Sequence, residues 1–184
     1  DSAITWGCVA FDYINSKMDG RIASTIDDAG ILTQAVRNAG HCDHLEIGTL
    51  YGGSAILAAL TKKTFHLKGM VICVDDMKAL PEVSRSPDFV MENARRLGVA
   101  DRIKVILSNS HSWKPDRMFA SAYIDASHDY KSCKADFENV KAVVEKYAIF
   151  HDYDICHPGV MQAVREAWPI VYLAHHTAVT QRPD

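Results

Sequence analysis

The sequence predicts an α/β protein in which a doubly wound, mostly parallel sheet forms a single domain. Short apolar runs alternate with helical patterns along the 184 residues, and parallel strands need such helical crossovers. Several apolar runs end in a glycine turn or an acidic residue, at the strand end where parallel sheets bind ligands. No linker divides the chain into two halves. The expected strands are residues 45–48, 71–75, 103–107, 122–125, 148–152 and 170–174.

Helices are expected before the first strand and between the later ones. Apolar residues recur at helical spacing in residues 1–40, which indicates one or two helices ahead of an α/β core of residues 41–184. Ser86 suits the N-cap of a later helix, with Pro87 at the first helical position and Gly98 just past the end. The helices expected between the strands are residues 54–62, 87–97, 131–146 and 160–168.

Composition and charge limit the partners and the location. The net charge of −3 gives no electrostatic reason to expect a nucleic acid or an anionic membrane as a partner. No apolar stretch approaches the roughly 18 residues of a membrane-spanning helix. The five cysteines are widely spaced and include no C-x-x-C pair, which favours a reducing, cytoplasmic location and argues against a zinc–thiolate site.

The first expected strand runs into a glycine-rich turn, Glu46-x-Gly48-x-x-x-Gly52-Gly53-Ser54. Glycine has no Cβ, so a ligand can approach the backbone closely there. The wide spacing of Gly48 and Gly52 differs from the G-x-G-x-x-G pattern of dinucleotide-binding proteins and argues against a nicotinamide cofactor. The turn therefore favours a nucleoside-type ligand without a pyrophosphate, and the alternative is an ordinary strand–helix turn.

The next two expected strands end in polar residues that suit the rest of such a ligand. Asp75 closes the second strand, where doubly wound nucleoside-binding proteins place an acid for the ribose hydroxyls. One of Asp75 and Asp76 could instead cap the following turn. The third strand leads into Ser110 and His111, where an adenine edge could be read, and the alternative there is an ordinary polar loop.

Acid and imidazole groups follow the fourth and fifth expected strands and form the sharpest signal. Asp125 and Asp152 face one crevice if these strands are neighbours, and two carboxylates suit magnesium. A nearby imidazole, such as that of His151, would also admit manganese, iron or zinc. His128 could remove a proton from a metal-bound hydroxyl, because imidazole titrates near neutral pH. The alternative is that the acids cap turns while His128 lies in a solvated loop.

Together these motifs resemble those of class I S-adenosylmethionine-dependent methyltransferases. The resemblance rests on the glycine turn, on Asp75, and on the patterns I-D-x-x-H-x-Y at residues 124–130 and H-D-Y with a later P-G-V at residues 151–160. It covers residues 43–164. The group that it resembles most is the small-molecule O-methyltransferases, including macrocin-type and cephalosporin-hydroxylase-like proteins, with catechol O-methyltransferase a more distant relative. It implies the Rossmann-like fold of that class.

The resemblance also implies a role for each motif. One set of residues would bind S-adenosylmethionine, another would hold a divalent metal, and His128 would be the general base. The implied cofactor residues are Glu46, Gly48, Gly52 and Ser54 at the methionine end, Asp75 at the ribose, and Ser110 and His111 beside the adenine. The implied metal ligands are Asp125, His151 and Asp152.

The activity implied is metal-assisted transfer of a methyl group to a hydroxyl of a small molecule. Two departures keep a catalytically degenerate binding protein as an alternative. His151 stands where relatives often have a carboxylate, and residues 170–180 are short for the usual closing hairpin. We therefore expect a smaller sheet, with an acceptor lid that is missing or donated by the second subunit of a homodimer. A nicotinamide-dependent oxidoreductase is the third hypothesis.

Overall fold

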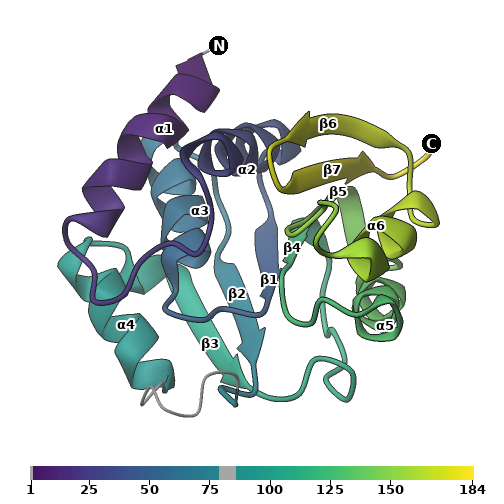
Figure 1. Ribbon diagram of the computed structural model, residues 1–184. Helices are drawn as coiled ribbons and strands as arrows, with labels where there is room; N and C mark the ends of the chain where they lie inside the picture. Colours follow the sequence, from purple (N-terminus) through teal and green to yellow (C-terminus); the bar gives the residue numbers. More distant parts are fainter. Residues whose placement is uncertain (1, 79–85) are drawn as a thin grey trace.

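The computed structural model describes residues 2–78 and 86–184, whose strands form one seven-stranded sheet (Figure 1). The strands are β1 (Asp43–Ile47), β2 (Val71–Asp75), β3 (Ile103–Leu107), β4 (Phe119–Ile124), β5 (Val144–Phe150), β6 (Ile170–Ala174) and β7 (Thr177–Gln181). Their order across the sheet is β3-β2-β1-β4-β5-β7-β6. β1 to β5 are parallel, whereas β7 is antiparallel to both of its neighbours. This sheet confirms the predicted fold class.

Helices cover both faces of the sheet. They are α1 (Ser2–Asn15), α2 (Ile26–Ala39), α3 (Gly53–Thr64), α4 (Pro87–Arg96), α5 (Tyr130–Val140) and α6 (Pro158–Arg165), with a short 3₁₀ turn, η1 (Ala100–Arg102), before β3. In Figure 1, α1, α3 and α4 lie on one side of the sheet, and α5 and α6 lie on the other. Two apolar clusters form the core, one on each face. Among the described residues, no helix has the length and apolar character needed to cross a membrane.

Local signals explain several helix boundaries. Thr25 begins α2 through a capping box in which the Thr25 and Asp28 side chains each accept a hydrogen bond from the other residue's backbone N–H. The Ser86 hydroxyl accepts a hydrogen bond from the Phe89 N–H at 3.2 Å, as expected for an N-cap. Gly98, just past α4, has a φ of +68°, a conformation that favours glycine.

The helix predicted over residues 131–146 is wrong at its C-terminal end. α5 ends at Val140, and Val144 already belongs to β5. Phe137, Val140 and Val144 imitate one face of a helix because all three are buried in the same apolar cluster. A tight turn separates the last two, with the Val143 N–H donating to the Val140 carbonyl at 2.9 Å. Packing on the sheet, rather than a continuous helix, therefore explains their spacing.

The C-terminal segment also differs from the expectation. β6 and β7 form an antiparallel hairpin that completes the sheet, so the expectation of a smaller sheet without this hairpin is wrong. β7 was not predicted because its five residues, TAVTQ, carry only a weak apolar pattern. Tertiary contacts stabilise it instead: the buried Thr180 hydroxyl donates a hydrogen bond to the Ala148 carbonyl of β5 at 3.0 Å.

Candidate active site

A cavity of about 720 Å³ lies at the carboxyl ends of β1, β2, β4 and β5. The strand order reverses between β1 and β4, and ligands of doubly wound proteins bind at such a point. The predicted site residues that line this cavity are Gly48, Asp75, Ser110, His111, Asp125, His128, His151 and Asp152. Ser54 lines a smaller cavity that shares Gly48 and Asp125 with the first. Glu46 and Gly52 line neither cavity.

Gly48 is required by the packing of two strand ends. Its φ is +85°, and a Cβ there would lie 2.2 Å from the backbone oxygen of Asp125. Glycine thus lets the turn after β1 approach the residue that follows β4. Gly52 also has a positive φ, of +88°, but a Cβ on it would meet the Val90 side chain of α4 at 2.7 Å. The space beside Gly52 is therefore occupied by protein.

Asp75 organises the glycine turn from the end of β2. Its Oδ2 accepts hydrogen bonds from the Thr49 and Leu50 N–H groups at 2.8 and 3.2 Å, and its Oδ1 accepts one from the Met77 N–H at 2.6 Å. Asp76 accepts a hydrogen bond from the Lys78 N–H at 3.1 Å. Both acids therefore cap local turns, and both also line the cavity.

Glu46 is completely buried in β1 behind this turn. Neither of its carboxylate oxygens has a hydrogen-bond partner within the described part of the chain. Burial raises its pKa well above the ordinary value, a shift that Ser54 opposes and that the charges of Asp125 and Asp75 reinforce. A buried carboxyl group without a partner is costly, so this residue calls for a donor from a ligand or water.

The loop after β3 carries Ser110 and His111 and is anchored to α5. The Asn139 side-chain amide donates hydrogen bonds to the carbonyls of Ser110 and Trp113 at 2.9 and 2.8 Å. His111 Nε2 lies 3.3 Å from an oxygen of the buried Asp136. These contacts hold the loop at the cavity wall, on the side where the adenine was predicted.

Asp125, His151 and Asp152 converge at the ends of β4 and β5. His151 Nδ1 lies 3.5 Å from Asp125 Oδ1 and 3.3 Å from Asp152 Oδ2. One potential ligand atom from each residue lies within 4.8 Å of the other two, which makes the three a candidate metal site. Asp152 has a φ of +56°, an uncommon conformation for a residue with a side chain, and such residues cluster at functional sites.

These three groups alter one another's ionisation. Burial raises the pKa of Asp125. Burial also opposes the charged form of His151, but contacts with both carboxylates outweigh it and raise the pKa to about 10. The pKa of Asp152 lies well below its usual range, because hydrogen bonds from His128 and His151 outweigh the effect of burial. Without an ion, a protonated imidazole therefore balances the carboxylate charge, and metal binding would release that proton.

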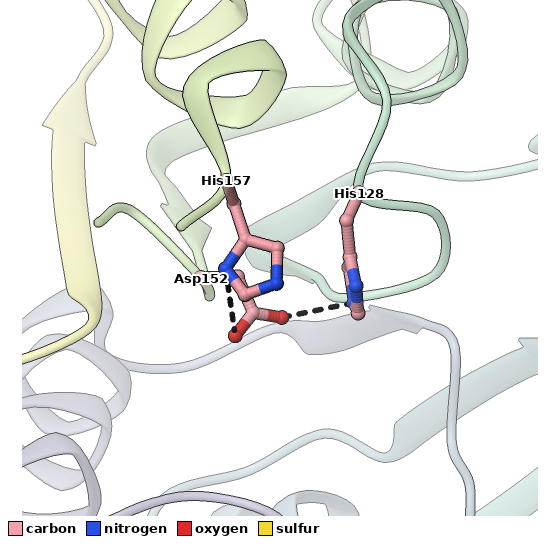
Figure 2. Close-up of side chains that lie close together, drawn as sticks. All are labelled: His128, Asp152 and His157. Atoms are coloured by element: carbon pink, nitrogen blue, oxygen red, sulfur yellow. Dashed lines mark ion pairs between the residues drawn. The ribbon is translucent and has the colours of Figure 1, made fainter. Parts of the chain in front are cut away.

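His128 and His157 approach Asp152 from two other segments (Figure 2). His128 Nε2 lies 2.9 Å from Asp152 Oδ2, and His157 Nδ1 lies 3.8 Å from Asp152 Oδ1. His128 also lies 3.9 Å from Asp125 Oδ1. The hydrogen bond to Asp152 raises the pKa of His128 above its ordinary value. The predicted proton acceptor thus contacts a predicted metal ligand directly.

Sequence reasoning missed His157 and Asp28. His157 immediately precedes α6, five residues after Asp152, and this short spacing was the available signal. Asp28 belongs to α2, and its Oδ2 lies 4.0 Å from His151 Nε2. The other oxygen of Asp28 accepts a hydrogen bond from the His176 N–H at 2.9 Å. No local pattern announces a contact between residues so far apart in the chain.

Comparison with known proteins places this arrangement in a family. Residues 45–155 match the model of a family described as a methyltransferase domain. No curated protein matches the chain. A SAM-dependent O-methyltransferase from Thermotoga maritima has a similar fold, with a TM-score of 0.64 and 10% identity over 90% of this chain and 69% of that one.

Two further solved structures share the fold. The O-methyltransferase from Bacillus cereus in complex with SAH has a TM-score of 0.58 and 19% identity, over 90% of this chain and 76% of that one. The N-methyltransferase NodS from Bradyrhizobium japonicum has a TM-score of 0.58 and 14% identity, over 84% and 93% of the two chains. The family match covers more than half of the sequence and confirms the resemblance inferred from the motifs. The chain belongs to the methyltransferase domain family.

Proposed function

We propose that the protein transfers a methyl group from S-adenosylmethionine to a hydroxyl of a small molecule, assisted by a divalent cation. One observation carries the proposal: a single cavity joins four of the seven predicted cofactor residues, Gly48, Asp75, Ser110 and His111, to the acid–imidazole cluster at β4–β5. Its volume of about 720 Å³ lies within the roughly 300–1,000 Å³ common for small-molecule sites. Donor and acceptor could therefore meet in one cavity.

The β1–β3 side of the cavity suits S-adenosylmethionine. Gly48, Thr49 and Leu50 of the glycine turn line both the main cavity and the smaller one beside it, so the turn could hold the methionine end of the cofactor. Glu46 is buried behind this turn, and its role toward the ammonium group stays a prediction. Asp75 faces the cavity with a carboxylate that the glycine turn holds in place, as a ribose-binding acid requires. The Bacillus cereus relative was solved in complex with SAH, which supports the same class of cofactor here.

The β4–β5 side suits a divalent cation. Asp125, His151 and Asp152 offer two carboxylates and one imidazole from adjacent strand ends, a donor set suited to Mg²⁺ or Mn²⁺. When bound, such a cation lowers the pKa of an acceptor hydroxyl and orients it. The protein then contributes mainly the alignment of acceptor and cofactor. Parallel pairing of β4 with β5 sets where Asp125, His151 and Asp152 lie relative to the cofactor side of the cavity.

The proposal does not depend on His128 as a proton acceptor. Its Nε2 already lies 2.9 Å from Asp152, and the same contact raises the pKa of His128. A raised pKa favours the protonated imidazole, and that form cannot accept another proton. The general-base role of His128 therefore stays a prediction, and it requires the contact with Asp152 to open.

Calorimetric titration with S-adenosylmethionine, S-adenosylhomocysteine and NAD, with and without Mg²⁺, tests the proposal. The first two should bind and NAD should not. Asp125→Ala should abolish Mg²⁺ binding and leave S-adenosylmethionine binding largely intact. Asp116→Ala, which removes an exposed acid paired with Arg117, is the matched control and should change neither. Binding of NAD alone, or equal loss of both ligands in Asp125→Ala, would overturn the assignment.

A further inference from the structure

We infer that His128, Asp152 and His157 form a second cation site, which shares Asp152 with the Asp125–His151–Asp152 group and takes an imidazole-preferring ion such as Zn²⁺. The inference goes beyond the proposed methyl transfer, for which one cation suffices. It concerns residues that converge from three segments: the loop after β4, the end of β5 and the residue before α6 (Figure 2).

The positions of the three side chains fit one ion. His128 Nε2 lies 2.9 Å from Asp152 Oδ2, and one potential ligand atom from each of the three residues lies within 4.8 Å of the other two. Two ligands that are each about 2.0–2.2 Å from one ion can be at most about 4.0–4.4 Å apart. Small side-chain rotations would therefore bring all three within bonding distance of one ion.

His157 is held as metal-bound imidazoles commonly are. Its Nδ1 lies 3.0 Å from Asp154 Oδ1, which leaves Nε2 for an ion. Asp154 is itself fixed, because it accepts a hydrogen bond from the Cys156 N–H at 2.8 Å and its other oxygen lies 2.7 Å from His176 Nδ1. A carboxylate that orients a histidine through its second nitrogen is a frequent companion of a metal ligand.

The cluster offers ligands for two ions. His128 and His157 form one group with Asp152, and Asp125 and His151 form the other, so Asp152 is common to both. Asp152 Oδ2 lies 2.9 Å from His128 Nε2 and 3.3 Å from His151 Nδ1, and Oδ1 lies 3.8 Å from His157 Nδ1. After a rotation of the carboxylate, each oxygen could bind one ion, as in sites where two metals lie about 3.5–4 Å apart. The second group holds two imidazoles for one carboxylate, and this composition favours Zn²⁺, Co²⁺ or Fe²⁺ over Mg²⁺.

The inference changes the part assigned to His128. An imidazole whose Nε2 binds an ion is not available as a general base through that nitrogen. The His128 and His157 side chains are also more exposed, at 49% and 30%, than the buried His151 at 6%, so the second ion would lie nearer to solvent.

Metal stoichiometry tests the inference without any methyl-transfer assay. Tag-free protein, stripped of metal, is dialysed against Zn²⁺ and its bound metal is measured by mass spectrometry. The wild type should hold two equivalents, and His157→Asn and Asp125→Asn one each. His157→Asn should weaken Zn²⁺ binding at the second site more than about 100-fold. Loss of even an outer partner of a metal ligand lowers metal affinity about 10- to 100-fold. His175→Asn, an exposed histidine outside both groups, should still hold two.

His128→Asn removes the second site by another ligand and covers the case in which His157→Asn fails to fold. Co²⁺ absorption spectra of the same proteins report whether imidazole nitrogen binds the ion. A wild type with fewer than two equivalents would overturn the inference, as would two equivalents that persist in both histidine variants. A wild type with one equivalent, which both His157→Asn and Asp125→Asn abolish, would mean a single mixed site. Failure of the proposed methyl transfer would appear instead as absent S-adenosylmethionine binding in the calorimetry.

Discussion

Gly48→Ala should destabilise the protein and displace Asp125 from the candidate metal site. Gly48 has a φ of +85°, and a Cβ added to it would lie 2.2 Å from the Asp125 carbonyl oxygen. Two other glycines separate these effects. Gly69 has a φ of +97° and a Cβ position 2.2 Å from the Cys42 carbonyl oxygen, whereas Gly40 has a φ of +88° and nothing within 4 Å.

The magnitude follows from this comparison. Gly40→Ala should cost only the backbone strain, roughly 1–3 kcal/mol of the free energy of unfolding. Gly48→Ala and Gly69→Ala must also move a neighbouring backbone carbonyl, because 2.2 Å is well inside the 3.0 Å that real Cβ contacts respect. Overpacking of this kind adds about 1–3 kcal/mol, so each should cost roughly 2–6 kcal/mol in total.

Urea unfolding at constant pH measures the free energy of unfolding that each of the three variants loses. Calorimetry with Mg²⁺ measures the cation affinity of the site. Gly48→Ala and Gly69→Ala should lose similar stability, but only Gly48→Ala should weaken cation binding, because only its clash involves a predicted ligand. The reasoning fails if Gly48→Ala costs no more than Gly40→Ala. It also fails if Gly69→Ala weakens cation binding as strongly as Gly48→Ala does.

Three further predictions concern single side chains. Burial, assisted by the charge of Lys62, lowers the pKa of His44 to about 3, so stability should fall by about 1.4 kcal/mol per unit as pH drops below about 6.5 toward 3. Urea unfolding of His44→Gln should show a shallower decline between pH 6.5 and 4.5, and equal slopes would contradict the assignment. Asp75→Asn should weaken S-adenosylmethionine binding at least about tenfold in calorimetry, since a charge-assisted hydrogen bond is worth about 1.5–3 kcal/mol. The Zn²⁺ stoichiometry of this variant should stay unchanged. Unaltered cofactor affinity would argue against the ribose role. Asn139→Ala should loosen the loop that carries Ser110 and lower the free energy of unfolding in urea by about 1–3 kcal/mol. It should weaken cofactor binding and leave cation binding unchanged. Normal cofactor affinity would exclude that loop from the site.

Errors in the sequence-based interpretation have one physical source. The helix predicted through residue 146 followed apolar spacing, yet Val144 is buried from a strand in the same cluster as Phe137 and Val140. Periodicity reports which residues are buried and not which element buries them. β7 was missed for the converse reason, since pairing with β5 stabilises five residues that have little apolar pattern of their own.

Most of the predicted site residues lie at one cavity because strand ends are local features. A residue at the end of a strand of a parallel sheet, or just after it, has its position set by that strand, and Asp75, Asp125 and Asp152 are of this kind. Gly52 has a local signal too, but the space beside it is filled by Val90 of α4. A motif therefore places a residue near a site without establishing what the residue touches.

The sequence alone was sufficient for the fold class, the family and the edge of the sheet where the candidate site lies. These depend on short-range patterns: alternating strands and helices, and the residue types that end each strand. Tertiary structure decided which groups meet at that edge. Asp28 contacts the His176 backbone across 148 residues and approaches His151, and His157 joins Asp152 through the path of the chain into α6. Such contacts depend on strand register and helix packing, which arise only when distant segments are brought together.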